Sequence, residues 1–264
     1  MTLDRLTICL GKTGDIITLL PLLKQQSNGA KASLMVAKDY ASVLDGVSYV
    51  NPVIFDGAIT ELDRAIKEAG TMASSIHVSQ VTGPSEDVLK RDVMQRNKEY
   101  MAEGKIADSF QKTLWHLLGH WGDFPKGWPL VFDRRSTDRE KVLLQKYAYG
   151  ATNKPTTMKI MLVSTGRQPG AKAGMNQFKF KSLLMTLLTR CFNRGWRIID
   201  LDSIVAERFY DLLGLYEKAS VLVTTDNAPL HLAYAVKKLP VCALIADKPS
   251  LWSGSAWRPN HVFH

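Results

Sequence analysis

The sequence predicts an α/β protein built as two domains, each with a parallel β-sheet, and three observations carry this prediction. The 264 residues suit one large domain or two small ones. Short apolar runs alternate with helical patterns along the chain, which is typical of parallel βαβ units. In each half, one apolar run leads through a polar turn into a helix, the usual arrangement of a ligand site in an open α/β sheet. Each half is therefore expected to be Rossmann-like.

Four apolar runs in the first half predict strands, and helical patterns separate them. The expected strands are Leu6–Leu10, Ala32–Ala37, Val53–Phe55 and Ser74–Val78, and the expected helices are Ile16–Gln26, Ala41–Leu44 and Ile59–Ala69. The charged segment Ser85–Gly104 is predicted to be an exposed helix or an insertion. A further helix is expected at Phe110–His120, followed by a turn-rich aromatic connector at residues 121–129.

The second half begins with an expected helix at Ser136–Tyr149 and a linker at Gly150–Thr157. The alternation then resumes, with expected strands Lys159–Val163, Trp196–Leu201, Val221–Thr224 and Val241–Ile245 and expected helices Ser182–Asn193, Val205–Lys218 and Pro229–Val236. We therefore predict a first domain at residues 1–133, a linker helix and connector at 134–157, and a second domain at 158–264.

Positive charge is concentrated in the second half of the chain. Residues 1–150 hold 19 basic and 18 acidic residues, whereas residues 151–264 hold 15 and 7, so nearly all of the net charge of +9 lies there. Such a field attracts a nucleotide diphosphate or an anionic polymer. The alternative is a solvated basic surface that serves solubility.

Composition indicates a cytoplasmic protein with neither a metal framework nor a transmembrane segment. The apolar runs are too short to span a bilayer, and no signal-peptide pattern opens the chain. Cys9, Cys191 and Cys242 are scattered in mostly apolar settings, as expected of small core residues in a reducing compartment. His116 and His120 have helical spacing but no acidic or cysteine neighbour, so no metal site is expected there.

The first turn that follows a strand is Gly11-Lys12-Thr13-Gly14-Asp15. It is not a Walker A loop, because the first glycine of that motif would fall at Leu6. It also lacks the third glycine of a dinucleotide fingerprint, which disfavours a nicotinamide oxidoreductase.

The second turn follows Ser220-Val221-Leu222-Val223 and reads Thr224-Thr225-Asp226-Asn227-Ala228-Pro229-Leu230-His231. The first N–H groups of a helix lack intrahelical partners and lie at the positive end of its dipole, so they bind phosphate well. Asp226 could accept hydrogen bonds from sugar hydroxyls. The alternative is an ordinary helix with Asp226 as its N-cap and His231 as a core histidine.

Taken together, the two turns resemble one enzyme family. Gly14-Asp15-Ile16-Ile17-x-x-x-Pro21, combined with Asp226-Asn227-Ala228-Pro229-x-His231-x-Ala233-x-Ala235, resembles the family 9 glycosyltransferases, the heptosyltransferase-like enzymes of lipopolysaccharide assembly. The resemblance extends into Pro240–Ile245 and Lys159–Gly166. The chain departs from the family at Asn227-Ala228, where Ser/Thr-Gly is usual, in the short span Asp200–Glu217, and at Phe178–Ser182, where a Lys-x-Trp-Pro element is degenerate.

The resemblance implies the GT-B architecture, in which two Rossmann-like domains face a cleft, the second holding a nucleotide sugar and the first the acceptor. It also implies that the tail Leu251–Pro259 packs back toward the first domain. The implied reaction is a metal-independent, inverting transfer from a nucleotide-diphosphate sugar, which is the donor substrate and not a cofactor. Asp15 matches the family's catalytic base, although helix capping is an alternative role for it.

Stabilising the departing diphosphate calls for a helix N-terminus and cations. The expected donor-binding residues are Gly14, Lys12, Thr13, Ser164, Arg167, Lys172, Lys179, Thr225, Asp226, Asn227, Ala228, Pro229 and His231.

The acceptor stays open between two anionic classes. One is a hydroxymethylated DNA base, as in phage-type DNA modification, favoured slightly by the basic second half, whose charge would offset backbone phosphates. Stacking on such a base could involve Trp115, Trp121, Trp128 or Trp257. The other is lipopolysaccharide core, as the family implies. Both place the protein in the cytoplasm of a bacterial or phage-infected cell. A catalytically inactive nucleotide-binding α/β module is a further alternative.

Overall fold

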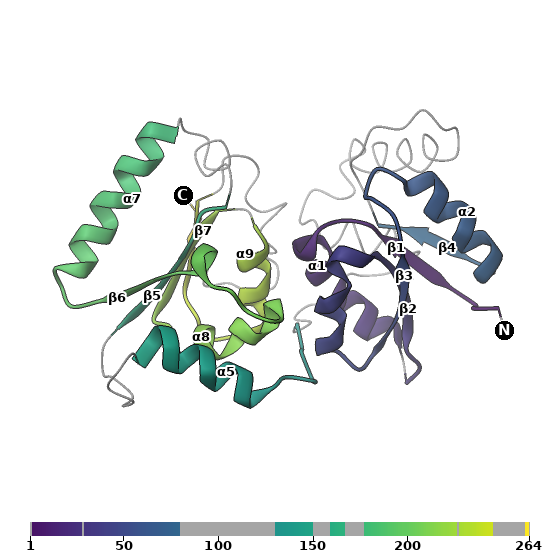
Figure 1. Cartoon of the computed structure of the whole chain (residues 1–264), viewed down its shortest axis with the longest axis horizontal. Coiled ribbons are helices and arrows are strands. Elements are labelled where there is room, and N and C mark those ends of the chain that lie inside the picture. The colour runs from purple at the N-terminus through teal and green to yellow at the C-terminus, as the bar shows by residue number, and fades with distance from the viewer. Residues whose placement is uncertain are drawn as a thin grey trace. The chain divides into compact units, whose positions relative to one another are not determined.

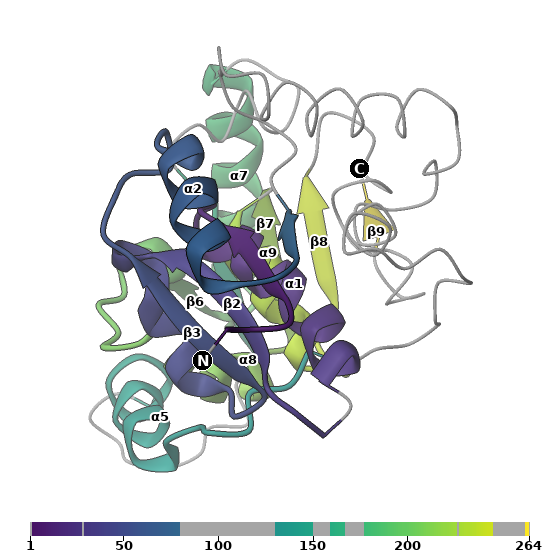
Figure 2. The same cartoon turned by 90° about the vertical axis from the view of Figure 1, so that its right-hand side faces the viewer.

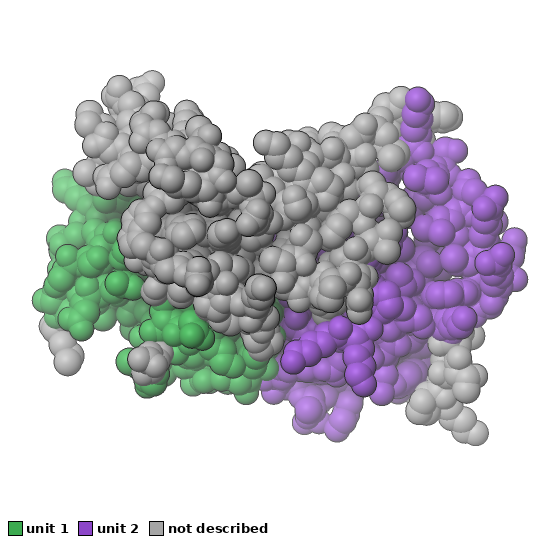
Figure 3. Space-filling view, turned by 180° about the vertical axis from the view of Figure 1, so that it is seen from behind, with its two compact units in different colours: residues 1–134 green, residues 135–264 purple. Residues whose placement is uncertain are grey.

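The chain divides into two compact units, Met1–Arg134 and Arg135–His264 (Figure 3). The computed structural model describes residues 2–27, 29–79, 130–149, 159–166, 177–225, 227–244 and 262–263. The predictions made for Ser85–Gly104, Phe110–His120, the connector at 121–129, the linker Gly150–Thr157 and the tail Leu251–Pro259 lie outside these residues. The four tryptophans proposed to stack on a base lie outside them too.

The first unit contains a four-stranded parallel sheet in the order β3-β2-β1-β4. Its elements are β1 Leu6–Cys9, α1 Thr13–Ser27, β2 Ala32–Ala37, the 3₁₀ helix η1 Lys38–Gly46, β3 Val50–Phe55, α2 Leu62–Met72 and β4 Ile76–Val78. All four predicted strands are present, and the parallel pairing confirms the expected βαβ units.

Helices cover both faces of this sheet. Buried residues of α2 recur at the spacing of one helical face, Leu62, Ala65, Ile66 and Ala69, and they pack with Leu6, Ile8 and Leu10 from the β1 segment. Figure 1 shows α1 on the other side of the strands, and Figure 2 views the first unit from the α2 side. Because both faces are buried, β1 reads as a continuous apolar run.

Two details of the first unit differ from the sequence prediction. Strand β3 begins at Val50, earlier than Val53, and so includes Pro52. Because β3 is the edge strand, the missing N–H of Pro52 removes no bond between strands. The short helix expected at Ala41–Leu44 is a 3₁₀ helix that extends over Lys38–Gly46.

The second unit contains a five-stranded parallel sheet in the order β6-β5-β7-β8-β9. Its elements are α5 Thr137–Leu143, the π-helix η2 Leu144–Tyr149, β5 Ile160–Ser164, α7 Gln177–Phe192, β6 Arg197–Asp200, the 3₁₀ helices η4 Leu201–Ser203 and η5 Phe209–Leu212, α8 Leu213–Lys218, β7 Val221–Thr225, α9 Ala228–Leu232, the 3₁₀ helix η6 Ala233–Ala235, β8 Val241–Leu244 and β9 Val262–Phe263. Figure 1 shows α7 on one face of this sheet and α9 on the other.

Three elements of the second unit correct the sequence prediction. The helix expected at Val205–Lys218 begins only at Phe209, because the Asp211 carboxylate accepts the backbone N–H of extended Arg208 (3.2 Å) and fixes the helix start there. The helix expected at Pro229–Val236 is a five-residue α-helix followed by a 3₁₀ turn. Strand β9, which pairs with β8, was not expected.

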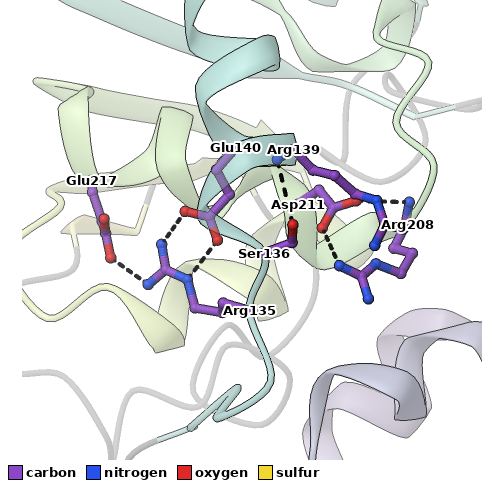
Figure 4. Close-up of polar contacts among 7 residues, drawn as sticks. All are labelled: Arg135, Ser136, Arg139, Glu140, Arg208, Asp211 and Glu217. Carbon is purple, nitrogen blue, oxygen red and sulfur yellow. Dashed lines mark hydrogen bonds and ion pairs between the residues drawn. The ribbon is translucent and has the colours of Figure 1, made fainter.

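An ion network joins the start of the second unit to helices α5 and α8 (Figure 4). The Arg135 guanidinium donates to both carboxylate oxygens of Glu140, at 2.7 and 2.6 Å, and to Glu217 Oε1 at 2.5 Å. The Glu140 side chain is only 8% exposed. A Cβ at Gly214 would lie 2.9 Å from the Glu140 Cβ, so a glycine is required for this approach. Arg135 is therefore the cation that makes a buried carboxylate tolerable here.

Candidate functional site

Strand order places one candidate ligand position in each sheet. In the first sheet β1 lies between β2 and β4, and in the second β5 lies between β6 and β7. In each case the chain runs from the first strand of the unit toward one edge and then returns to the other side of that strand, which creates a topological switch point beside it. Open α/β sheets bind ligands outside the carboxyl ends of the strands at such points. Both turns singled out in the sequence follow strands that border these points.

In the first unit, Asp15 holds the turn that leads from β1 into α1. Its Oδ2 accepts the backbone N–H of Lys12 at 2.8 Å, and the Ile16 N–H donates to the Lys12 carbonyl at 3.2 Å. A carboxylate in the first turn that reaches back to the residue before the helix is half of a capping box. A Cβ at Gly11 would lie 2.5 Å from Asp15 Oδ2, so this turn requires a glycine. Asp15 therefore caps α1, and its side chain is exposed at the carboxyl edge of the sheet.

The end of β1, directly before this turn, is apolar and buried. Cys9 is 1% exposed, as expected of a core cysteine. Burial, and next the negative charge of Asp15, raise the pKa of the Cys9 thiol to about 12. At the carboxyl end of β4, Ser79 donates its hydroxyl to the Ile8 carbonyl at 3.0 Å and joins the two strands that flank the switch point.

The raised pKa of Cys9 predicts a loss of stability in alkali. The folded thiol stays neutral, whereas the unfolded thiol ionises near its ordinary pKa of 9.0. The contribution of the neutral thiol to the free energy of unfolding is therefore fully present below pH 9 and is lost as the pH rises toward 12. Relative to Cys9→Ala, the wild-type free energy of unfolding should drop by up to about 1.4 kcal/mol per pH unit in this range. Urea unfolding of both proteins at pH 8, 9 and 10 measures the difference; parallel curves would contradict the prediction.

In the second unit, Asp202 organises the loop that follows β5. Its Oδ1 accepts the Ser164 hydroxyl at 2.7 Å, and its Oδ2 accepts the backbone N–H groups of Thr165 at 2.8 Å and Gly166 at 3.1 Å. Gly166 has φ +68°, the left-handed region that favours glycine. One carboxylate therefore fixes the backbone at Thr165 and Gly166.

Asn227 joins this turn to the end of β7. Its side-chain N–H₂ donates to Ser164 Oγ at 2.9 Å, and its Oδ1 accepts the Thr224 hydroxyl at 2.9 Å and the Leu230 N–H at 3.2 Å. Thr225 adds a second link, because its hydroxyl donates to the Thr165 carbonyl at 2.8 Å. The carboxyl ends of β5 and β7 thus form one connected polar edge.

The start of α9 differs from the sequence prediction. The N-cap is Asn227, so the alternative in which Asp226 caps this helix is wrong. Three residues form the first helical positions. Of these, Pro229 has no N–H and Leu230 donates its N–H to the Asn227 side chain, so the Ala228 N–H is the one left to bind a ligand. Asn227, which departs from the family pattern, therefore accepts the Leu230 N–H, a backbone donor that the sequence predicted to bind phosphate.

The structure brings together some of the predicted donor residues. Ser164, Thr225 and Asn227 meet at the polar edge, with Ala228 and Pro229 directly after them. His231 is 8% exposed within α9, and its ring lies 6.2 Å from that of Tyr234. Lys179 is exposed near the start of α7. In the first unit, Lys12, Thr13 and Gly14 form the turn that Asp15 caps. Arg167, Lys172 and Asp226 lie outside the described residues.

Sequence reasoning missed Asp202, Thr165 and Gly166. A signal for Asp202 was present, because it directly follows an expected strand that neighbours β5 in the sheet. Its influence reaches further: burial, and next the Asp202 charge, raise the pKa of Tyr216, whose hydroxyl donates to the Pro229 carbonyl at 3.1 Å. Asp202 therefore bonds the residues after β5 and also acts electrostatically on the tyrosine that bonds α9.

Removing the Asp202 carboxylate should loosen this loop without unfolding the unit. Because Asp202 is exposed, water can replace its bonds in part, and Asp202→Ala should lower the free energy of unfolding by about 1–2 kcal/mol. Amide hydrogen exchange at Thr165 and Gly166 should accelerate far more than exchange in β5. Glu207→Ala, which removes an ion pair with a 66% exposed carboxylate, is the matched control and should change neither quantity. Unaltered exchange in Asp202→Ala would contradict this role.

Among the described residues, no group of three or more His, Cys, Asp or Glu side chains is placed to hold a metal ion. No helix in the described parts of the chain is long and apolar enough to cross a membrane.

No protein-family model and no curated protein sequence matches the chain. Several solved structures do. A family 9 glycosyltransferase from Veillonella parvula is 12% identical over 100% of this chain and 88% of its own, with a TM-score of 0.63. The E. coli ADP-heptose lipopolysaccharide heptosyltransferase II is 14% identical, over 99% and 90%, with a TM-score of 0.59. An E. coli heptosyltransferase, WaaC, solved with ADP, is 14% identical, over 99% and 92%, with a TM-score of 0.57. The chain therefore has the fold of solved family 9 glycosyltransferases, the family that its two motifs resemble.

Proposed function

We propose that this protein is a glycosyltransferase that moves a sugar from a nucleotide-diphosphate sugar to an acceptor hydroxyl. The observation that carries the proposal is the position of the two motif turns. Each lies at the carboxyl edge of a parallel sheet, next to the switch point where such sheets bind ligands. The likeness in fold to family 9 glycosyltransferases supports the same conclusion independently of the motifs.

The donor binds at the polar edge of the second unit in this proposal. Asn227, Ser164, Thr225 and Asp202 hold the loops after β5 and β7, and the Ala228 N–H faces the diphosphate. The positive excess of the second half attracts the same group. Since one structural relative is an ADP-heptose transferase and another was solved with ADP, an adenine nucleotide is the first donor to test.

Asp15 acts as the general base in the first unit. The acceptor hydroxyl transfers its proton to the Asp15 carboxylate as its oxygen bonds to the anomeric carbon, and the bond from that carbon to the diphosphate breaks. A single displacement of this kind inverts the anomeric centre. The bond from the Lys12 N–H to Oδ2 orients the carboxylate for this role. As the resemblance implies, no step of this scheme calls for a metal ion.

For the acceptor, the relatives support a lipopolysaccharide core sugar better than DNA. Two of them are heptosyltransferases, one of which is named for lipopolysaccharide. The DNA hypothesis depends on the net charge alone. An inactive nucleotide-binding module stays the alternative to any transferase, motivated by Asn227, which occupies a donor at the start of α9.

A ligand screen tests the proposal. Thermal shift and calorimetry should be run with ADP, UDP and GDP, with ADP-heptose and with UDP-glucose, and turnover should be assayed with lipopolysaccharide core and with hydroxymethylated duplex DNA. A ligand at 100 times its dissociation constant should add about 2.7 kcal/mol to the free energy of unfolding. Binding with transfer supports the enzyme and identifies its acceptor. Binding without hydrolysis or transfer favours the inactive module, and no binding to any nucleotide overturns the proposal.

A further inference from the structure

A polar cavity lies at the amino edge of the first sheet, the edge opposite to the turn that holds Asp15. Its volume is about 540 Å³, within the range of pockets that bind small molecules. The residues that lead into β1 and β2 line it together with the last turn of α1. Because β1 is four residues long, the two edges of the sheet lie roughly 13 Å apart along this strand. The cavity is therefore separate from the candidate site at the carboxyl edge.

Strand alternation explains why a polar side chain lies at the base of the cavity. Leu6 and Ile8 pack toward α2 in the core of the first unit, so Thr7 points to the opposite face of the sheet, which α1 covers. Thr7 is 1% exposed, and it lines the cavity. Within the described part of the chain, no hydrogen bond uses the Thr7 hydroxyl. A buried hydroxyl without a protein partner calls for a ligand or an ordered water that bonds it.

Two cations border the same cavity. Arg5 precedes Thr7 by two residues, so the two side chains leave the same face of the chain. Since Thr7 pairs with Leu34, Arg5 lies by extension beside Ala32, and Lys31 is the residue directly before Ala32. Both basic side chains line the cavity, and neither forms an ion pair with a described residue. Both positive charges are therefore available to a ligand.

The end of α1 and one carboxylate complete the lining. A helix C-terminus carries partial negative charge, which opposes the binding of an anion. Here the Ser27 hydroxyl donates to the Lys24 carbonyl at 2.7 Å, and the Ala30 N–H donates to the Ser27 carbonyl at 2.5 Å, so these carbonyls already have donors. Gln26 and Asp4 add an amide and a carboxylate, both of which accept hydrogen bonds from hydroxyl groups.

We propose that this cavity binds a sugar phosphate at a site separate from the transfer reaction. Arg5 and Lys31 hold the phosphate, because guanidinium and ammonium groups form charge-assisted hydrogen bonds to its oxygens. Thr7 and Asp4 bond the sugar hydroxyls. An inorganic anion would meet the like charge of Asp4 without using it, and a neutral sugar would leave both cations without a partner. A sugar phosphate uses all four side chains.

Calorimetry with the full-length chain tests this proposal. Glucose 6-phosphate should bind more tightly than inorganic phosphate, and glucose should bind most weakly. Arg5→Ala and Lys31→Ala should each weaken the binding of glucose 6-phosphate by about tenfold or more, because each removes a charge-assisted hydrogen bond. Thr7→Val keeps the shape of the side chain but loses one neutral hydrogen bond, so it should weaken binding by about two- to tenfold. Thr7→Ser keeps the hydroxyl and should bind like the wild type.

Lys38→Ala provides the matched control. Lys38 follows β2 at the carboxyl edge, its side chain is 69% exposed, and the variant loses the same charge as Lys31→Ala. It should bind glucose 6-phosphate like the wild type, and thermal unfolding should verify that every variant folds. Equal losses in Lys38→Ala and Lys31→Ala would overturn the proposal. So would an absence of binding, or binding of inorganic phosphate or glucose as tight as that of glucose 6-phosphate.

Amide hydrogen exchange locates the ligand. Glucose 6-phosphate should slow exchange at residues 2–5 and 30–33, which border the cavity. Protection at residues 12–15 or 164–166 instead would place the ligand at the carboxyl edges of the sheets and overturn the proposal. Neither experiment depends on whether the protein transfers a sugar, so a negative result here leaves the proposed function untouched.

Discussion

Asp15→Asn should lower kcat for sugar transfer by about 10²- to 10⁴-fold, the contribution typical of a positioned general base. The amide oxygen can still accept the Lys12 N–H, so the turn and helix α1 should keep their structure. What the variant loses is the ability to take the proton from the acceptor hydroxyl. The measurement is transfer with the donor and acceptor identified by the ligand screen, together with donor affinity by calorimetry, which should be unchanged.

A second carboxylate of the same unit provides the control. Asp56, whose side chain is 87% exposed in an ion pair with Lys38, lies after β3 and away from both motif turns in the sequence. Asp56→Asn should keep wild-type kcat. Full activity in Asp15→Asn would leave Asp15 with its capping role alone and would require another base. Asp15→Ala is a less specific test, because it also removes the cap and destabilises α1 by about 1 kcal/mol.

Arg135→Ala should be the most destabilising of the substitutions considered for the second unit. It leaves the Glu140 carboxylate, 8% exposed, without the guanidinium that binds both of its oxygens. Breaking a buried ion pair from one side costs about 3–5 kcal/mol. Because the Arg135 side chain is 28% exposed, we expect the lower end, about 3 kcal/mol. Urea unfolding at neutral pH measures the change.

Three further variants separate charge from geometry in this network. Arg135→Lys keeps the charge but loses the paired bonds, so its stability should be intermediate. Arg135→Met with Glu140→Leu removes both charges and should recover much of the loss. Lys141→Ala disrupts the exposed pair with Asp138 and should change stability by less than about 0.5 kcal/mol. A loss from Arg135→Ala as small as that from Lys141→Ala would show that Glu140 tolerates isolation.

The sequence by itself determined the fold class and the positions of eight of the nine strands that the structure describes, all except β9. Segments such as Leu6–Cys9 and Val221–Thr225 are mostly apolar and contain no charged residue, because both faces of a parallel sheet are covered, and this pattern is visible without any structure. Spacing also placed both motif turns directly after strands. Helices with a strong local pattern, such as Leu62–Met72, were predicted to within a few residues for the same reason.

Only the tertiary structure decided which side chains meet at the candidate site. Asp202 follows β6 and Ser164 follows β5, 38 residues apart in the sequence, and they touch because parallel pairing brings the carboxyl ends of neighbouring strands to one edge. The choice of Asn227 as N-cap and the late helix start at Phe209 also depend on side-chain hydrogen bonds that the apolar pattern of the sequence does not reveal. Periodicity shows which residues share a face. Which neighbours cover that face is decided by contacts between segments that are distant in the sequence.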